Sequence, residues 1–142
     1  MANSIAIGVA YQDQNIINAD TVQAKSILTT SVIGYTASSF SAVTQQNNKT
    51  TAVAITTPAG SITTANAQLA PSANAVFTVT NPAISAKDTI VISIASGGTL
   101  GAYLVNIAAI ADGSFSVLIK NVTNNAYAEA VTLNYAIFHV GN

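Results

Sequence analysis

The residues of this chain that could do acid–base or nucleophilic chemistry are few and widely spaced. The only histidine is His139, and the carboxylates are Asp13, Asp20, Asp88, Asp112 and Glu129. A hydrolase needs an imidazole oriented by partners, or two carboxylates that face each other across a cleft. His139 lies close to the C-terminus, where such partners are usually missing, and no Gly-x-Ser-x-Gly pattern supplies a serine nucleophile.

Most of the acids also have a local structural interpretation. Asp112 precedes a glycine and is typical of a turn, whereas Asp88 follows Lys87 and is expected to form a solvent-exposed pair with it. Asp20 is expected to cap a short helix, and Glu129 to protect an edge strand from pairing. The sequence therefore predicts no catalytic residue and no enzyme.

Metal and cofactor sites are not expected either. The chain has no cysteine, which excludes disulfides and thiolate ligands. Asp13-Gln14-Asn15 is similar to the start of a calcium loop, but the glycine and the bidentate glutamate of such a loop are missing. A cation bound on a threefold axis by symmetry copies of one Asp or Asn stays open. The glycine-rich stretch 97–101 has no following lysine, so it predicts a turn rather than a phosphate site.

Two Asn-x-Thr patterns are interpreted as chance matches to the glycosylation signal. They are Asn48-Lys49-Thr50 and Asn121-Val122-Thr123. The N-terminus shows neither the positive region nor the apolar stretch of a secretory signal, so we expect synthesis and folding in the cytoplasm.

Low charge is the most unusual feature of the composition. Only 6% of the 142 residues are charged and 50% are hydrophobic, whereas about 25% of a typical soluble domain is charged. Soluble monomers normally keep a charged surface that separates them from their neighbours, so this chain is expected to cover much of its surface with partners. Its four scattered lysines and net charge of -1 disfavour nucleic acid as a partner. No apolar run approaches the roughly 20 residues that cross a bilayer, so no membrane partner is expected.

Alternating apolar residues predict strands in most of the chain beyond residue 50. Two weaker strands are expected near 52–56 and 61–63. Five stronger runs place β-branched or aromatic side chains on one face: 75–80, 89–95, 102–110, 114–120 and 130–138.

The aromatic residues divide into two groups. Those on the inward faces of the expected strands are interpreted as core rather than as a sugar-binding platform: Tyr103, Phe115 and Tyr135. Phe138 faces away from this core and is a candidate for contact with a neighbouring subunit. Three aromatic residues of the irregular N-terminal part are also candidates for partner contacts: Tyr11, Tyr35 and Phe40.

Turn residues separate the expected strands. Asp112-Gly113 predicts a hairpin that joins 103–110 to 114–120. Ser96-Gly97-Gly98-Thr99 predicts another turn, whereas Pro58-Ala59-Gly60 and Asn81-Pro82 are expected at loop corners. Short strands with such spacing predict an all-β fold, an antiparallel β-sandwich or jelly-roll-like domain.

The first 43 residues are less regular than the rest. Residues 21–28 are compatible with a brief helix or another strand, and the polar stretch 43–51 is interpreted as a linker. We therefore expect an irregular N-terminal segment, 1–43, followed by a β-sandwich domain, 44–142.

An ordered set of residues in this β-domain resembles a known family. The matching stretches are 43–51, 60–63, 77–84, 97–99, 101–103, 113–115 and 133–137. Together, the region from Thr44 to Val140 resembles the small β-domain of tailed-bacteriophage virion proteins, which include capsid decoration (cement) proteins, head fibres and tail-fibre parts. The resemblance covers about two thirds of the chain and brings no catalytic motif with it.

This resemblance implies a homotrimeric module on the capsid surface of a virion, where it binds and stabilises the major capsid protein. Residues 1–43 are expected to contact the capsid, and the β-domain to form the trimer. A fibre or receptor-binding (host-attachment) module is the alternative. A small hydrolase is a third possibility, and it would require a pair of acids brought together by the fold.

Overall fold

A computed structural model describes residues 26–27, 29 and 32–140 of the chain. A compact unit begins at Gly34 and contains every strand of the described part. Its elements are a 3-10 helix η1 (Ala37–Ser39) and the strands β1 (Phe40–Thr44), β2 (Val53–Ala54), β3 (Ala59–Thr63), β4 (Gln68–Leu69), β5 (Asn74–Thr80), β6 (Thr89–Gly97), β7 (Tyr103–Ala111), β8 (Ser114–Asn121), β9 (Tyr127–Ala128) and β10 (Val131–Phe138).

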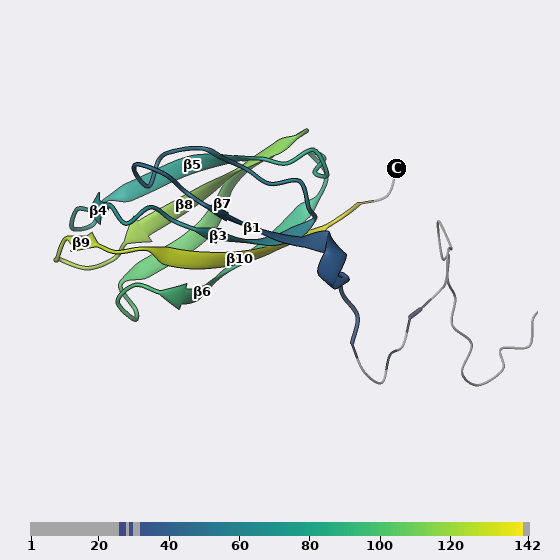
Figure 1. The fold of residues 1–142 in the computed structure, drawn as a ribbon, viewed down its shortest axis with the longest axis horizontal. Helices are drawn as coiled ribbons and strands as arrows, with labels where there is room; N and C mark the ends of the chain where they lie inside the picture. The colour runs from purple at the N-terminus through teal and green to yellow at the C-terminus, as the bar shows by residue number, and fades with distance from the viewer. Residues whose placement is uncertain (1–25, 28, 30–31, 141–142) are drawn as a thin grey trace, which may run out of the picture. The chain divides into compact units, whose positions relative to one another are not determined.

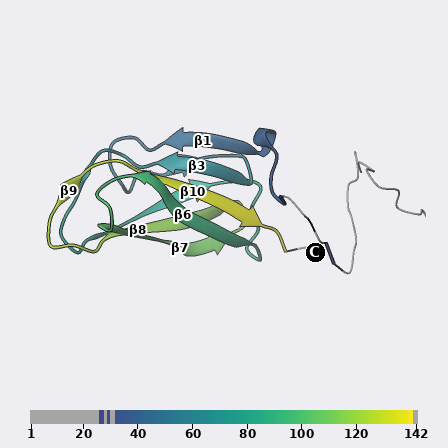
Figure 2. The same ribbon diagram turned by 90° about the horizontal axis from the view of Figure 1, so that it is seen from below.

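Two four-stranded sheets pack against each other as a sandwich (Figure 1). Sheet A has the strand order β1-β3-β10-β6, and sheet B has the order β2-β5-β8-β7. Figure 2 shows the four strands of sheet A side by side. The short strands β4 and β9 form a separate antiparallel ribbon at one end. The all-β sandwich predicted from the sequence is confirmed.

Two of the strand pairs are parallel, which the alternating pattern did not predict. β1 pairs with β3 and β2 pairs with β5 in the same direction, whereas the remaining pairs are antiparallel. The chain passes from sheet A to sheet B at β2 and returns to sheet A at β3. Such a crossing lets two strands of one sheet run parallel although they follow closely in sequence.

The centre of the sandwich is filled by the side chains that the alternation places inward. Burial alternates strictly along β8, where Phe115, Val117 and Ile119 are at most 2% exposed. Phe115 of sheet B and Tyr135 of sheet A pack with ring centroids 5.4 Å apart and ring planes tilted by 56°. Each fully buried aliphatic or aromatic side chain contributes about 1.5–3 kcal/mol to folding. The core assignment of Tyr103, Phe115 and Tyr135 is confirmed.

The predicted Asp112-Gly113 hairpin is present and joins β7 to β8. Ala111 and Ser114 are opposite each other on either side of the turn. Gly113 has φ of 75°, in the left-handed region that favours glycine. The turn therefore fixes the register of the two strands, with one bulge between Ile107 and Ala109.

Residues 43–51 are not a free linker, and that prediction is wrong. Gln45 and Lys49 are only 2% and 3% exposed. The Gln45 side chain donates to the Thr51 carbonyl oxygen and accepts a hydrogen bond from the Ala65 backbone N–H. The polar residues of this stretch satisfy buried backbone groups rather than solvating an exposed loop.

Two further sequence boundaries differ from the structure. Ala59 and Gly60 begin β3 instead of forming a loop corner, and a Cβ at Gly60 would lie 2.7 Å from the Ser41 carbonyl oxygen of β1. The compact unit begins at Gly34 rather than near residue 44, because β1 pairs with β3 along its whole length. The expected helix or strand over 21–28, and the residues Tyr11, Asp13 and Asp20, lie largely or wholly outside the described residues.

Candidate functional site

Charged side chains are almost absent from the strands of the sandwich. In the described part of the chain, Lys120 on β8 is the one charged residue within a strand. The other charged groups of the described residues lie in the loops at the two ends of the sandwich. Chemistry that needs a charged group must therefore use one of those ends, and the broad outer faces of the sheets are left for contacts of another kind.

Asp88 is buried, so the prediction of a solvent-exposed pair with Lys87 is wrong. Its residue is 6% exposed, and Oδ2 accepts from the Ser85 backbone N–H at 2.8 Å and lies 2.9 Å from His139 Nδ1. Its Oδ1 accepts from the Val140 backbone N–H at 2.9 Å. The backbone donors Ser85 and Val140, together with His139, lower the pKa of Asp88 to about 2.

The Asp88–His139 pair has the geometry of an oriented imidazole, but its visible role is structural. A carboxylate bonded to Nδ1 can orient a histidine for general-base catalysis, provided that the other ring nitrogen faces a nucleophile. None of the hydrogen bonds described for the His139 ring reaches a hydroxyl group. The contacts that the structure gives tie the end of β10 to the turn before β6.

At the opposite end of the sandwich, Lys49 joins three loops. Its Nζ donates to the Ala65 carbonyl oxygen at 2.9 Å, the Glu129 carbonyl oxygen at 2.6 Å and Thr64 Oγ1 at 3.3 Å. Burial lowers the pKa of Lys49, and the nearby Glu129 carboxylate opposes this shift. This lysine supplies hydrogen bonds to buried oxygen atoms and is not part of a basic surface patch.

Glu129 closes the turn that follows β6. Its carboxylate accepts hydrogen bonds from the Thr99 backbone N–H and from Thr99 Oγ1, at 2.5 and 3.2 Å. The backbone donor of Thr99 is the main cause that lowers the pKa of Glu129. The carboxylate therefore holds this turn in place, a role beyond the edge protection expected from the sequence.

The structure does not bring together the two acids that a hydrolase would have to combine. Asp112 accepts from the Ala86 backbone N–H beyond one end of β7, whereas Glu129 binds Thr99 before the other end. A nine-residue strand is about 30 Å long. Paired glycosidase carboxylates lie only about 5–9.5 Å apart. Asp112 and Glu129 cannot flank one glycosidic bond in this fold.

The second glycosylation pattern falls on a buried side chain. Asn121 is 0% exposed, and its amide nitrogen donates to the carbonyl oxygens of Leu69, Ala70 and Asn125. Its Oδ1 accepts from the backbone N–H and the hydroxyl of Thr123. A glycan has no access to this nitrogen, so Asn121-Val122-Thr123 serves to close a loop.

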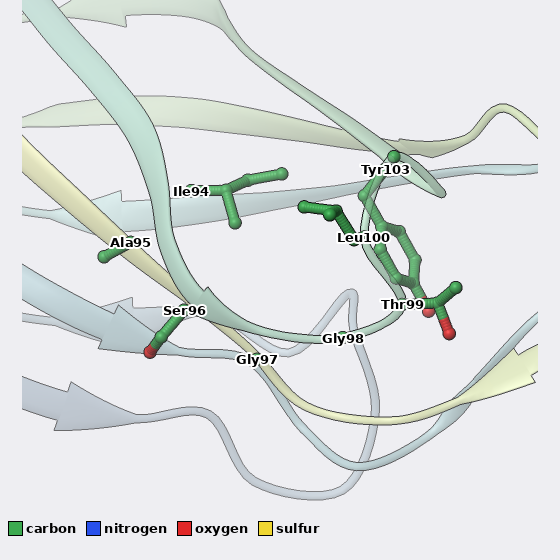
Figure 3. Close-up of a pocket in the computed structure, with 9 residues that line it drawn as sticks. Ile94, Ala95, Ser96, Gly97, Gly98, Thr99, Leu100 and Tyr103 are labelled. Carbon is green, nitrogen blue, oxygen red and sulfur yellow. The ribbon is translucent and has the colours of Figure 1, made fainter.

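A hollow of about 390 Å³ lies beside the turn between β6 and β7 (Figure 3). It is lined by residues 94–101 and Tyr103, and Figure 3 shows the side chains of Ile94 and Leu100 among them. Leu100 is fully exposed. Burial, with the neighbouring Glu129 carboxylate, raises the pKa of Tyr103 to about 12, so its phenol stays neutral. The hollow is suited to an apolar group rather than to a charged one.

The strands of sheet A carry no charged residue, so the outer face that they form is uncharged. Phe40, Ala59, Ala136 and Val91 form one row across its four strands. Phe40, Val91 and Phe138 are 48%, 55% and 60% exposed. Part of this face is hollowed to about 280 Å³ between β1, β6 and β10. An uncharged face with exposed aromatic residues is typical of a protein-binding surface.

Comparison with known proteins adds no relative to these observations. The chain matches no family model, no curated protein and no solved structure. Among the described residues, no helix is long and apolar enough to span a membrane. The same residues contain no group of three or more His, Asp or Glu side chains that could hold a metal ion.

Sequence reasoning missed several of these groups. The buried positions of Lys49 and Asp88 depend on partners far away in sequence, and neither has a local pattern that signals burial. The exposed Val91 could have been found, because it occupies the outward position of an alternating run whose apolar residues otherwise face inward.

Proposed function

We propose that this protein is a structural subunit of a tailed-phage particle, a capsid decoration protein that binds and stabilises the major capsid shell. The observation that carries the proposal is the near absence of charge from the strands, together with the exposed aromatic and aliphatic residues of sheet A. Such a surface is suited to a permanent protein–protein interface, because permanent interfaces are more apolar than transient ones. The resemblance to phage virion domains implies the partner, the major capsid protein.

The proposed mechanism is multivalent clamping without bond-making chemistry. The outer face of sheet A lies against the shell, and the chain before Gly34 adds a second contact on a neighbouring capsid subunit. Contacts that are joined in one molecule bind together more tightly than each would alone. Copies associated as trimers would multiply this effect and oppose the internal pressure of packaged DNA.

A fibre or receptor-binding module is the second candidate. The hollow beside the β6–β7 turn and the exposed Leu100 favour it, because exposed turns at the end of a β-sandwich are common places for recognition. This candidate predicts few copies per particle and binding to a host surface component rather than to shells.

The test is to measure copy number and shell binding. Quantitative mass spectrometry of purified virions should find this chain in proportion to the major capsid protein, whereas a fibre protein would match the minor tail proteins. Purified chain should co-sediment with empty shells. Val91→Asp should weaken this binding, because it places a charge in an apolar interface. Val76→Asp, a matched change on the outer face of sheet B, should bind as wild type.

An unchanged affinity of Val91→Asp for shells would remove sheet A from the mechanism. Failure of the wild-type chain to bind shells, with a copy number like that of tail proteins, would replace the decoration role by the fibre role.

A further inference from the structure

The core of the sandwich is closed in its centre but open along one side. β6 and β7 are the edge strands of sheets A and B, and they lie next to each other on that side. Their inward side chains form a strip that we call the β6–β7 seam: Ile90, Ile92, Ile94, Val105 and Ile107. Ile90, Ile92, Val105 and Ile107 pack on the core but remain partly exposed, and Ile94 is 39% exposed.

The register shows how abruptly burial changes towards the seam. Ile90, Ile92 and Ile94 lie beside Ile137, Tyr135 and Leu133 of β10, which are at most 4% exposed. Val105 and Ile107 lie beside Ile119 and Val117 of β8, which are 0% exposed. The apolar rows that are buried in β10 and β8 therefore become partly exposed to solvent in the edge strands β6 and β7.

Neither edge strand has the charged residues, prolines or short length that commonly protect an open edge. Both are nine residues long, and neither contains a charged residue or a proline. Soluble monomers usually protect such edges with charges, prolines or short strands. Each strand does have one bulge, at Ala95 in β6 and between Ile107 and Ala109 in β7. These bulges interrupt a long continuous intermolecular sheet, but they leave the apolar seam uncovered.

The turn between the two strands extends the seam at one end. The hollow of about 390 Å³ is lined by Ile94 and Tyr103, and Leu100 projects beside it with its side chain fully exposed. Figure 3 shows these residues around one space. A protruding leucine next to an apolar hollow is a shape that a second copy can match.

We propose that copies of this chain associate through their β6–β7 seams, with the seams facing one symmetry axis and Leu100 at the contact. An identical strip is a suitable occupant because it is apolar and uncharged like the seam itself. Nine-residue strands are about 30 Å long, and two sheets packed about 10 Å apart are about 20 Å thick with their outer side chains. The side of such a sandwich therefore covers about 600 Å², which approaches the roughly 800 Å² per partner of a standard stable interface.

This inference rests on the proposed function for its setting, since it names the surface by which a decoration protein would self-associate. It leaves the outer face of sheet A free for the shell. The two proposals therefore use separate surfaces and can fail separately.

The experiment is sedimentation equilibrium of the full-length chain over a range of concentrations, with the wild type and four variants compared, Val91→Asp among them. The wild type should be a defined oligomer, and Leu100→Asp should associate about a hundredfold or more weakly, because its carboxylate would be buried without a partner. Leu100→Ala should give a smaller weakening in the same direction. Val76→Asp, a change at an exposed position outside the seam, should associate as wild type. Melting temperatures should match once the proteins are diluted to monomers, since neither side chain is part of the core and only association would otherwise separate them.

A monomeric wild-type chain would contradict association through the β6–β7 seam. So would an oligomer that Val91→Asp dissociates and Leu100→Asp does not. Shell binding separates this result from the function. A monomer that still binds shells would overturn the seam and keep the decoration role. An oligomer dissociated by Leu100→Asp that ignores shells would support the seam and contradict that role.

Discussion

Single polar side chains in the described part of this protein hold its loops together. The described acids, Asp88, Asp112 and Glu129, each accept a hydrogen bond from at least one backbone N–H of a neighbouring turn. Asn81, which is 0% exposed, accepts from the Ala83 backbone N–H with Oδ1 and donates from Nδ2 to the Thr57 carbonyl oxygen and to the Tyr135 hydroxyl. The three carboxylates thus supply acceptors for backbone N–H groups of turns, whether the turn is part-buried, as at Ser85, or exposed, as at Ala86 and Thr99.

Asp88→Asn should destabilise the protein in a pH-dependent way. The folded pKa of Asp88, about 2, lies below its ordinary value of about 4. The contribution of the ionised carboxylate to stability is therefore complete above about pH 4 and is lost as the pH falls towards 2. The difference in Tm between wild type and Asp88→Asn should be largest near pH 5 and should shrink towards pH 2.

Asp112→Asn is the control for this series, because the Asp112 carboxylate makes one described hydrogen bond, to Ala86, on an exposed turn. It should lower the Tm less at pH 5. A Tm difference for Asp88→Asn that stays constant between about pH 5 and 2 would contradict the ionised, hydrogen-bonded state of this residue.

Phe115→Ala should lower the free energy of unfolding by about 3–5 kcal/mol, since it leaves a cavity between the two sheets. Phe115 is 2% exposed and contacts Tyr135. Phe138→Ala removes the same side chain from an exposed position and should change stability by about 0.5 kcal/mol or less. Urea unfolding of both variants measures the difference, and equal effects would show that the β8 and β10 registers are wrong.

At the scale of elements, β1 decides where the folded unit begins. Its five residues pair in parallel with β3, and Val43 packs against the core. Phe40 and Ala42 face the opposite side, so apolar residues occur on both faces of this strand. The strand thus closes one edge of sheet A and contributes Phe40 to its outer face.

Two truncations test this role of β1. Deletion of residues 1–33 should leave a folded sandwich, because the compact unit starts at Gly34. Deletion of residues 1–43 removes all of β1 except Thr44 and should cost a further 2–5 kcal/mol or so, from lost strand hydrogen bonds and the lost burial of Val43. Chemical denaturation of the two fragments compares them directly. Equal stability would show that β1 is dispensable.

At the scale of the whole molecule, the sandwich has a buried apolar core in its centre and exposed apolar side chains at its periphery. The inward faces of the four inner strands are buried, whereas the β6–β7 side and the outer face of sheet A expose aliphatic and aromatic residues. Charge does not compensate for this exposure, because Lys120 is the one charged residue in the described strands. Both proposals follow from this distribution: one uncharged surface for the shell and another for further copies.

The sequence by itself determined the strands of the core. Alternation with a period of two is a local property of an extended chain, so runs such as 75–80, 114–120 and 130–138 predicted strands and their buried faces correctly. The Asp112-Gly113 hairpin was predictable for the same reason, since its partners are adjacent in sequence. β1 was missed because its apolar residues lie on both faces, and β4 and β9 because two residues show no period.

Only the tertiary structure decided which strands are neighbours and which polar groups are buried. The parallel β1–β3 pair, the contact of Asp88 with His139 and the bond from Lys49 to the Glu129 carbonyl oxygen join residues that are distant in sequence. The open β6–β7 seam is also a tertiary property. An inward side chain is buried only if another strand lies beyond it, and that depends on the order of the strands in the sheets rather than on the alternation within each one.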